Sequence, residues 1–429
     1  MRIVIRGGRI IDPANKLDVT GDVCIADGVI TAVGAGPDDF HADHVINAHD
    51  MVVCPGFIDL AVHLREPGQE HKGTIASETL AAAAGGVTTV CIPPDSDPVI
   101  DSPAVVELIR QRNDATGSAH VAMLGAMTKE LKGAEITEMH ALKQAGCVGI
   151  SNGMAAVQNS LVLRRAMEYA ASYDLKTFLV PEDAHLANGG CVHEGAISIR
   201  MGLPGIPECA ESIAVGRDLL LVEQTGVAAH FCRLSSGRAM NMVARARHDG
   251  LPVSADVAAH QLHLTEMDLV GFNGNCHVRP PLRSQRDRQI LLEGLQRGIF
   301  SAVCSDHQPH ESSAKLLPFA ETQPGISGLE TLLALTLRAG AEAGMPLMDV
   351  LALLTSGPAE VLGIARGCLT VGAVADVCVF REQETWLLTP EHMHSKGKNT
   401  PFMHWELRGK VQHTVLAGRP VYAAPGMAS

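Results

Sequence analysis

Eight apolar runs alternate with helical patterns through the middle of the chain, and this alternation constrains the fold more than any other feature. The runs are 56–62, 87–92, 119–125, 147–151, 177–181, 227–233, 252–257 and 300–305. They are continuously apolar, as expected for parallel strands that are buried on both faces. Eight strand–helix units over about 300 residues predict a (β/α)8 barrel. A doubly wound open sheet is the alternative, but no G-x-G-x-x-G motif follows the first strand.

The two ends of the chain have a different pattern. Residues 1–55 contain short alternating runs, with Asp27-Gly28 as a two-residue hairpin turn between "VCIA" and "VITAVG". Residues 366–429 contain similar runs, in "VADVCVF" and "HTVLAGRPVY". We therefore predict that residues 1–55 and 366–429 form the two parts of one small β-sandwich, and that residues 56–365 form the barrel.

The composition excludes several classes of partner. A net charge of −13 argues against nucleic acid or an anionic membrane as the main partner. No apolar run approaches the roughly 20 residues of a membrane helix, and the N-terminal "MRIVIRGGRIID" lacks the apolar core of a signal peptide. The 11 cysteines are scattered singly with no C-x-x-C pair, which is typical of reduced thiols. We expect a cytoplasmic protein that binds neither nucleic acid nor membrane.

Chemistry in such a barrel is located at the C-terminal ends of the strands. Polar and charged residues follow most of the eight runs. In chain order, the candidates are His63, Arg65, Glu66, Asp95, Asp97, Ser151, Asn152, Glu182, Asp183, Arg233, His260, Asn275, Arg279, Arg283, Asp306, His307 and His310.

Several longer motifs resemble one known family. They are "GFIDLAVHLREPG", "AAAAGGVTT", "PVID", "MGLPGIPECAESIAVGRDL", "RPPLRS", "SDHQPH", "GISGLET" and "SKGKNTPF". With them, nearly the full chain resembles the bacterial dihydroorotases of the amidohydrolase superfamily. The resemblance implies a (β/α)8 barrel with a composite β-sandwich, and the reversible cyclisation of carbamoyl-aspartate to dihydroorotate in pyrimidine biosynthesis. In working members, metal ions are held by a His-x-His pair on strand 1, an acidic residue or lysine on strand 4, histidines on strands 5 and 6, and an aspartate on strand 8.

Most of these metal positions differ in this chain. The first strand-1 histidine is replaced by alanine. The strand-4 carboxylates, normally in Asp-Asp-Gly, are replaced by Ser-Asn-Gly with one residue deleted, and the histidines on strands 5 and 6 become valine and arginine. The lost positions are Ala61, Asn152, Val180 and Arg233, and the remnants of the metal set are His63 and Asp306, the family's general base.

Two remnants are too few for a catalytic zinc site, which takes at least three protein ligands. Arg233 stays protonated and would repel a divalent cation. Without a metal, nothing lowers the pKa of an attacking water, and Asp306 is then vestigial. We expect no metal and no other cofactor, or zinc if the chain is an active enzyme after all. We also predict that Arg233 neutralises Asp306 in place of the lost cation.

Other histidines are weak substitutes for the lost ligands. His230 lies three residues before Arg233 on a strand, so its side chain should point to the opposite face. His185 and His193 follow strand 5 and would have to rearrange to reach the site. His260 matches a family position near the substrate, and a satisfied polar role is expected for it.

Positions that match substrate contacts are better preserved. Arg65 corresponds to the family arginine that pairs with the substrate carboxylate, a bidentate role that suits a guanidinium. Asn275 and His310 match two further contacts. The family asparagine in the strand-2 loop is Asp95 here, a negative charge where a dianionic substrate would lie. In the alternative interpretation, Arg65 now pairs with Asp95 or Glu66.

The resemblance extends to noncatalytic dihydroorotase-like chains that assemble with aspartate carbamoyltransferase. It implies a structural subunit for the catalytic chain of that transferase, and we expect a homo-oligomer within a larger complex. Two alternatives stay open. One is an active metal-dependent dihydroorotase or other cyclic amidohydrolase with an altered metal site. The other is a small-molecule sensor that keeps Arg65 and Asn275.

Overall fold

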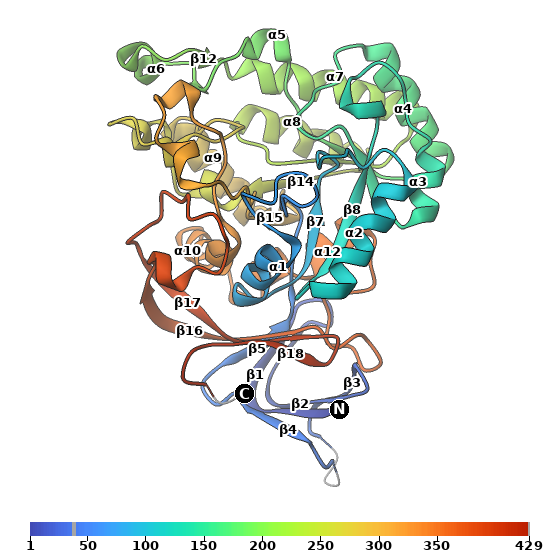
Figure 1. Cartoon of the computed structure of the whole chain (residues 1–429), viewed down its shortest axis with the longest axis vertical. Coiled ribbons are helices and arrows are strands. Elements are labelled where there is room, and N and C mark those ends of the chain that lie inside the picture. Colours follow the sequence, from blue (N-terminus) through green and yellow to red (C-terminus); the bar gives the residue numbers. More distant parts are fainter. Residues whose placement is uncertain (37–39, 428–429) are drawn as a thin grey trace.

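The computed structural model describes residues 1–36 and 40–427, and it consists of a barrel packed on a sheet that both ends of the chain build (Figure 1). Eight parallel strands form the barrel, and all eight predicted runs contribute one. They are β6 (Phe57–Asp59), β7 (Val87–Ile92), β8 (His120–Ala126), β9 (Gly149–Ser151), β10 (Thr177–Leu179), β13 (Ala229–Phe231), β14 (Val253–Ala258) and β15 (Ala302–Cys304). The predicted (β/α)8 barrel is confirmed.

The barrel closes just beyond the C-terminal ends of its first and last strands. The hydrogen-bonded strand order runs from β15 through β14, β13, β10, β9, β8 and β7 to β6. Val62 and His307 then form a parallel bridge across the gap. The His307 N–H donates to the Ala61 carbonyl at 2.9 Å, and the His63 N–H donates to the His307 carbonyl at 2.9 Å. Closure therefore brings the ends of β6 and β15 together.

Helices surround the barrel. They are α1 (Ile75–Ala84), α2 (Pro103–Thr116), α3 (Met139–Ala145), α4 (Ser160–Ser172), α5 (Ala184–Ala187), α6 (Ala196–Met201), α7 (Cys209–Thr225), α8 (Gly237–His248), α9 (Gln285–Gln296), α10 (Leu332–Glu342), α11 (Leu347–Ala352) and α12 (Ser356–Leu362). Their ends follow capping chemistry. At the start of α1 the Thr74 hydroxyl accepts from the Ser77 N–H at 3.1 Å, and α7 ends at Gly226 with φ 69°. Among the described residues, no helix has the length and apolarity needed to cross a membrane.

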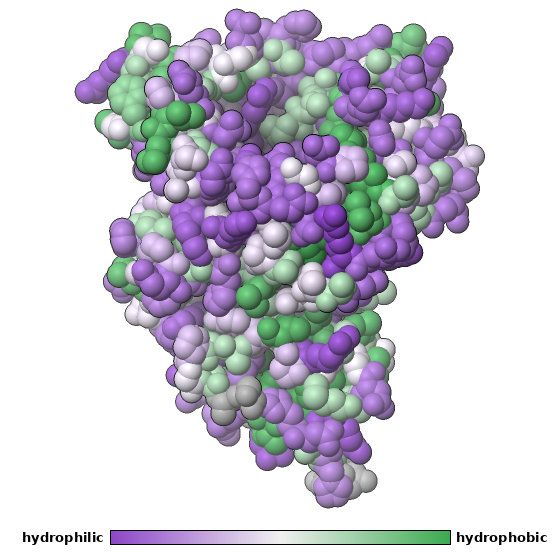
Figure 2. Space-filling view, in the orientation of Figure 1, coloured by the Kyte–Doolittle hydropathy of each residue, from purple (hydrophilic) through white to green (hydrophobic). Residues whose placement is uncertain are grey.

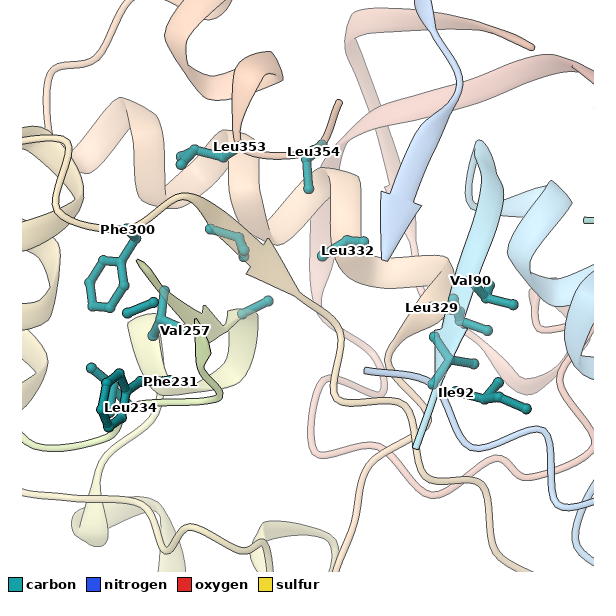
Figure 3. Close-up of a cluster of buried hydrophobic side chains, with 14 of the residues drawn as sticks. Val90, Ile92, Phe231, Leu234, Val257, Phe300, Leu329, Leu332, Leu353 and Leu354 are labelled. Carbon is teal, nitrogen blue, oxygen red and sulfur yellow. The ribbon is translucent and has the colours of Figure 1, made fainter. Parts of the chain in front are cut away.

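Polar residues cover most of the face seen in Figure 2, and two apolar cores lie beneath the surface of the barrel. The larger core fills the space between strands and helices, and Figure 3 shows part of it, with Phe231 and Val257 from the strands and Leu332 from α10. A smaller core fills the barrel interior and includes Ala61 and Phe178. Burial of each large apolar side chain contributes about 1.5–3 kcal/mol, so both cores hold the strand ends in place.

The second sheet joins the two ends of the chain, as the sequence predicts. Its strands are β1 (Arg2–Asp12), β2 (Leu17–Ala26), β3 (Val29–Gly34), β4 (His44–Asn47), β5 (Val52–Pro55), β16 (Val377–Leu387), β17 (Glu406–Leu416) and β18 (Arg419–Ala423). They form one hydrogen-bonded network in which β5 joins β1 to β16. The predicted hairpin turn is confirmed, with φ 52° at Asp27 and 83° at Gly28. Residues 37–39 and 428–429 of the two predicted end segments lie outside the described residues, and the exact domain boundaries stay a prediction.

Candidate functional site

A buried ion pair lies at the C-terminal ends of β13 and β15. Arg233 Nη1 donates to Asp306 Oδ1 at 3.0 Å, and the two side chains are only 4% and 1% exposed. The predicted contact between Arg233 and Asp306 is therefore confirmed. The two residues come from strand ends that are separated by 73 positions in the sequence and that the barrel brings together.

A bend in the backbone turns Arg233 into the barrel. Strand β13 ends at Phe231, and Arg233 has a φ of 54°. The Arg233 N–H donates to Asp256 Oδ1 at 2.5 Å, while His230 Nε2 lies 2.9 Å from the other oxygen of this carboxylate. His230 lies on the inner side, with its ring centroid 5.5 Å from that of Phe178 in the barrel interior, and the Arg233 guanidinium reaches Asp306 inside the mouth. The prediction that they point to opposite faces is wrong, because strand alternation stops at the bend.

The neighbouring carboxylate of Asp306 keeps the Arg233 guanidinium positively charged. Burial lowers the pKa of Arg233, but the negative charge of Asp306 outweighs that effect and raises the pKa above its ordinary value. The guanidinium is also covered from one side by the Met154 sulfur, 3.4 Å from Nη2. Arg233 Nε and Asp306 Oδ2 are buried without a hydrogen-bond partner in the structure. The pair is thus a fixed, desolvated charge pair.

The surviving metal-type histidine has a different partner. His63 Nε2 lies 3.0 Å from Asp95 Oδ2, with the two side chains 8% and 31% exposed. Burial raises the pKa of Asp95, but the neighbouring His63 and then Arg65 and Arg233 lower it to about 2. His63, Arg65 and Asp95 line a cavity of about 30 Å³, room for about one water molecule. His63 is consequently engaged with a carboxylate that the sequence places among the vestigial substrate contacts.

Arg65 does not pair with Asp95 or Glu66 in the structure. Its Nε donates to the Pro309 carbonyl at 3.1 Å, and its Nη2 lies 3.1 Å from His310 Nε2. Glu66 instead accepts from Arg112 Nη1 at 2.9 Å and from the first N–H of α1 at 2.8 Å. The alternative in which Arg65 pairs with one of these carboxylates is wrong, because Glu66 caps a helix and Asp95 binds His63. Burial, and then the charge of Arg65, lower the pKa of His310 to about 3.

The other three positions where the resemblance implies a metal ligand are Ala61, Asn152 and Val180. None of them provides a ligand beside the Arg233–Asp306 pair. Ala61 is 5% exposed and packs in the barrel interior. Asn152 accepts from the Thr128 hydroxyl at 2.7 Å and donates to the Leu131 carbonyl at 3.2 Å, so its amide is used to hold the loop after β8. Val180 and Asn152 line a separate cavity of about 30 Å³, together with Asp218 of α7.

Other predicted candidates are distributed around the rim. His260 is 2% exposed and burial lowers its pKa to about 4. Asn275 lies half-buried in η4 (Gly274–Cys276), where its N–H donates to the Asn273 side chain. His193 lies 3.2 Å from the buried Arg283, and His185 is exposed on α5. No hydrogen bond links these three histidines to His63 or Asp306, but His260 is close enough to Asp306 and Arg233 for their charges to act on its pKa.

The residues present at the strand ends do not fit a metal ion. Within residues 1–36 and 40–427, the only group of three or more potential ligands with ligand atoms within 4.8 Å of one another is His230, Cys232 and Asp256, inside the barrel. There His230 Nδ1 lies 2.7 Å from the Ser254 hydroxyl and Nε2 faces Asp256, so both ring nitrogens already have partners. Burial raises the pKa of the Cys232 thiol well above its usual range, which disfavours the thiolate that a metal requires.

Two contributors to the site are absent from the candidates that sequence reasoning selected. Asp256 positions Arg233, and the available signal was a carboxylate within the apolar run 252–257. Met154 covers the guanidinium, and an apolar residue in a loop gives no comparable signal.

The fold is of the amidohydrolase type. The structure is similar to the L-hydantoinase (dihydropyrimidinase) from Arthrobacter aurescens, with a TM-score of 0.89 and 21% identity over 100% of this chain and 97% of that chain. It is also similar to the D-hydantoinase (dihydropyrimidinase) from a Thermus species, with a TM-score of 0.86 and 20% identity over 100% of this chain and 96% of that chain. At this level of identity the similarity shows the fold alone.

Sequence relatives specify the family. The dihydro-orotase-like family model matches residues 50–239. A dihydroorotase-like protein of Pseudomonas aeruginosa is 47% identical over 97% of this chain and 99% of the relative. A dihydroorotase of Syntrophus aciditrophicus is 40% identical over 98% of this chain and 99% of the relative. The chain belongs to the dihydroorotase-like family.

Proposed function

We propose that the chain is a noncatalytic dihydroorotase homologue that acts as a structural subunit of aspartate carbamoyltransferase in the cytoplasm, in de novo pyrimidine biosynthesis. The observation that carries this proposal is the buried Arg233–Asp306 pair. A guanidinium, protonated under all ordinary conditions, holds the carboxylate that would serve as metal ligand and general base in a working dihydroorotase.

The chemistry of the remaining groups supports the same proposal. A hydrolytic zinc site needs at least three protein ligands and an open position for water. His63 is bound to Asp95 and Asp306 is bound to Arg233, so both remnants are already engaged. The chain's own residues therefore hold an ion pair and a histidine–carboxylate contact where a working enzyme would activate water.

The preserved architecture supports the proposed assembly role. The barrel and its composite sheet are intact, and the buried pair fills the catalytic place without distorting the strand order. Relatives of this chain from two Pseudomonas species are named dihydroorotase-like proteins, at 47% and 45% identity. We propose that this chain is a homo-oligomer and that it binds the catalytic chain of the transferase in a larger complex.

Three measurements on one preparation test the proposal: metal content after dialysis, dihydroorotase activity, and complex formation with the purified catalytic chain of the transferase. We expect a zinc content far below one ion per chain, no activity above a buffer blank, and a stable complex. The matched variant His63→Ala should leave the metal content unchanged. Absence of a complex, with transferase activity unaltered by removal of this chain from the cell, would refute the assembly role.

An active cyclic amidohydrolase is the second candidate, and the 40% identity to the dihydroorotase of Syntrophus aciditrophicus favours it. It requires a metal that uses His63 and Asp306 together with recruited ligands. Stoichiometric zinc that disappears in His63→Ala or Asp306→Asn, together with hydrolysis of dihydroorotate, would establish this candidate and contradict the noncatalytic one.

A further inference from the structure

Exposed apolar side chains gather on one sector of the barrel rim. Three rim segments carry them: α6, the η3–η4 region (η3, Glu266–Leu269) after β14, and the η5 region (η5, Ser312–Lys315) after β15. We call this surface the rim patch, and its six large apolar residues, each at least 50% exposed, are Ile199, Met267, Val270, Phe272, Leu316 and Leu317. Figure 2 shows apolar surface at the upper left, over the part of the chain that Figure 1 labels α6.

The three segments are in contact with one another. The first two approach each other at the start of α6, where a Cβ placed on Gly195 would stand 3.3 Å from Glu266 Oε2. The second and third segments pack closely, since a Cβ placed on Gly274 would stand 2.7 Å from the Lys315 carbonyl oxygen. The segments that carry the apolar side chains are therefore neighbours on the rim. Such a cluster on a protein surface marks an interaction site more often than single exposed residues do.

One residue of the rim patch carries a backbone conformation that its side chain disfavours. Phe272 is 54% exposed and has a φ of 59°. A bulky side chain in the left-handed region is uncommon, and Asn or Gly would adopt that conformation more readily. Neither burial nor local geometry accounts for an aromatic residue at this position. A contact with a partner would account for it, because Phe and Met are enriched in the cores of protein interfaces.

The charge around the rim patch is negative. Segments 194–201, 265–276 and 311–323 contain five acidic residues and two basic ones. The acidic residues are Glu194, Glu266, Asp268, Glu311 and Glu321, and the basic ones are Arg200 and Lys315. Lys315 is turned inward, with its Nζ donating to the Gln323 carbonyl at 2.6 Å, and burial lowers its pKa to about 7. Apolar side chains flanked by carboxylates thus form the surface.

The negative charge of the rim patch limits the kind of partner that can bind it. In a two-fold dimer the same surface of each copy meets, so two rim patches would bring like charges together in an interface where their repulsion is strengthened by desolvation. An anionic lipid surface would be repelled for the same reason. A protein surface that is apolar and positively charged complements both the apolar side chains and the negative charge of the rim patch.

We propose that the rim patch is the docking surface for a protein partner with an apolar, positively charged face. This inference rests on the proposed function, in which that partner is the catalytic chain of aspartate carbamoyltransferase. The rim surrounds the strand ends, so a partner docked there would cover the place where a working hydrolase admits its substrate. A noncatalytic chain has no need to keep that entrance open.

The test measures binding of the full chain to the purified catalytic chain of the transferase by sedimentation velocity. The double variant Phe272→Asn/Leu316→Ser should weaken binding at least tenfold with an unchanged or higher melting temperature, since Asn suits the backbone at 272 and Leu316 is 82% exposed. Leu220→Ser is the matched control, because Leu220 is 67% exposed on α7, away from the rim, and should leave binding unchanged. Glu266→Lys should weaken binding, and raised salt should weaken wild-type binding.

The outcomes separate the two proposals. If the wild-type chain binds and the double variant binds equally well, the rim patch is not the docking surface while the assembly role stands. If the wild-type chain does not bind at all, the assembly role fails and the inference fails with it. If the wild-type chain associates with itself and the double variant is a monomer, the rim patch is an interface between copies and the charge argument is wrong.

Discussion

Replacement of Arg233 by methionine should destabilise the protein far more than replacement of an exposed arginine. Asp306 is 1% exposed, and Arg233→Met would leave it buried without its cation. For the 3.0 Å pair, Coulomb's law at an effective dielectric constant of about 20 gives roughly 5 kcal/mol of attraction. Removal of one partner from a buried pair typically costs about 3–5 kcal/mol. We therefore expect Arg233→Met to lower the free energy of unfolding by about 3–5 kcal/mol.

The assay is a double-mutant cycle followed by urea unfolding. Asp306→Asn completes the cycle, because Asn tolerates the left-handed backbone at this position, where φ is 48°. Each single variant should be strongly destabilised, and the double variant should be more stable than the sum of the two losses by at least about 2 kcal/mol. Arg238→Met, at a residue 71% exposed on α8, is the control and should change stability by less than about 0.5 kcal/mol. A coupling energy below about 0.5 kcal/mol would refute the idea that the guanidinium neutralises Asp306.

Two further predictions concern the pH dependence of stability. Burial raises the pKa of Asp59 to about 7, so the folded chain keeps a proton that the unfolded chain releases near pH 4. Stability should fall by about 4 kcal/mol as the pH rises from 4 to 8, and Asp59→Asn should remove this loss in urea titrations at pH 4 and 8. His260 has the opposite sign: burial lowers its pKa to about 4, so stability should fall by about 3 kcal/mol as the pH drops from 6.5 to 4. His260→Gln should lack that loss, and a variant that follows the wild-type pH profile would contradict the assignment.

The sequence predicted the barrel because the periodicity of buried parallel strands is a local signal that needs no tertiary information. All eight apolar runs contribute a strand, and the hairpin turn at Asp27-Gly28 has the backbone conformation that its residue types favour. The Arg233–Asp306 contact was also predictable, since both residues follow strands that end at the same mouth of a barrel.

The partners of His63 and Arg65 could not be predicted, because they depend on how loops turn after the strands end. Arg65 has a φ of 64°, and its guanidinium reaches the Pro309 carbonyl and His310 instead of the nearer carboxylates in the sequence. The same limit explains the error at His230, where an alternation rule that holds within a strand was extended past the bend at Arg233. Asn152 likewise turns its amide towards the loop after β8.

Three residues at the mouth share the left-handed backbone that only glycine adopts freely: Arg65, Arg233 and Asp306, with φ of 64°, 54° and 48°. Each costs about 1–2 kcal/mol, and the surrounding barrel imposes it whether or not the side chain does chemistry. The backbone at these three positions therefore directs the side chains independently of any reaction at the mouth. A protein engineer who wishes to install a new activity at the mouth inherits three backbone bends, after β6, β13 and β15, that already direct side chains there.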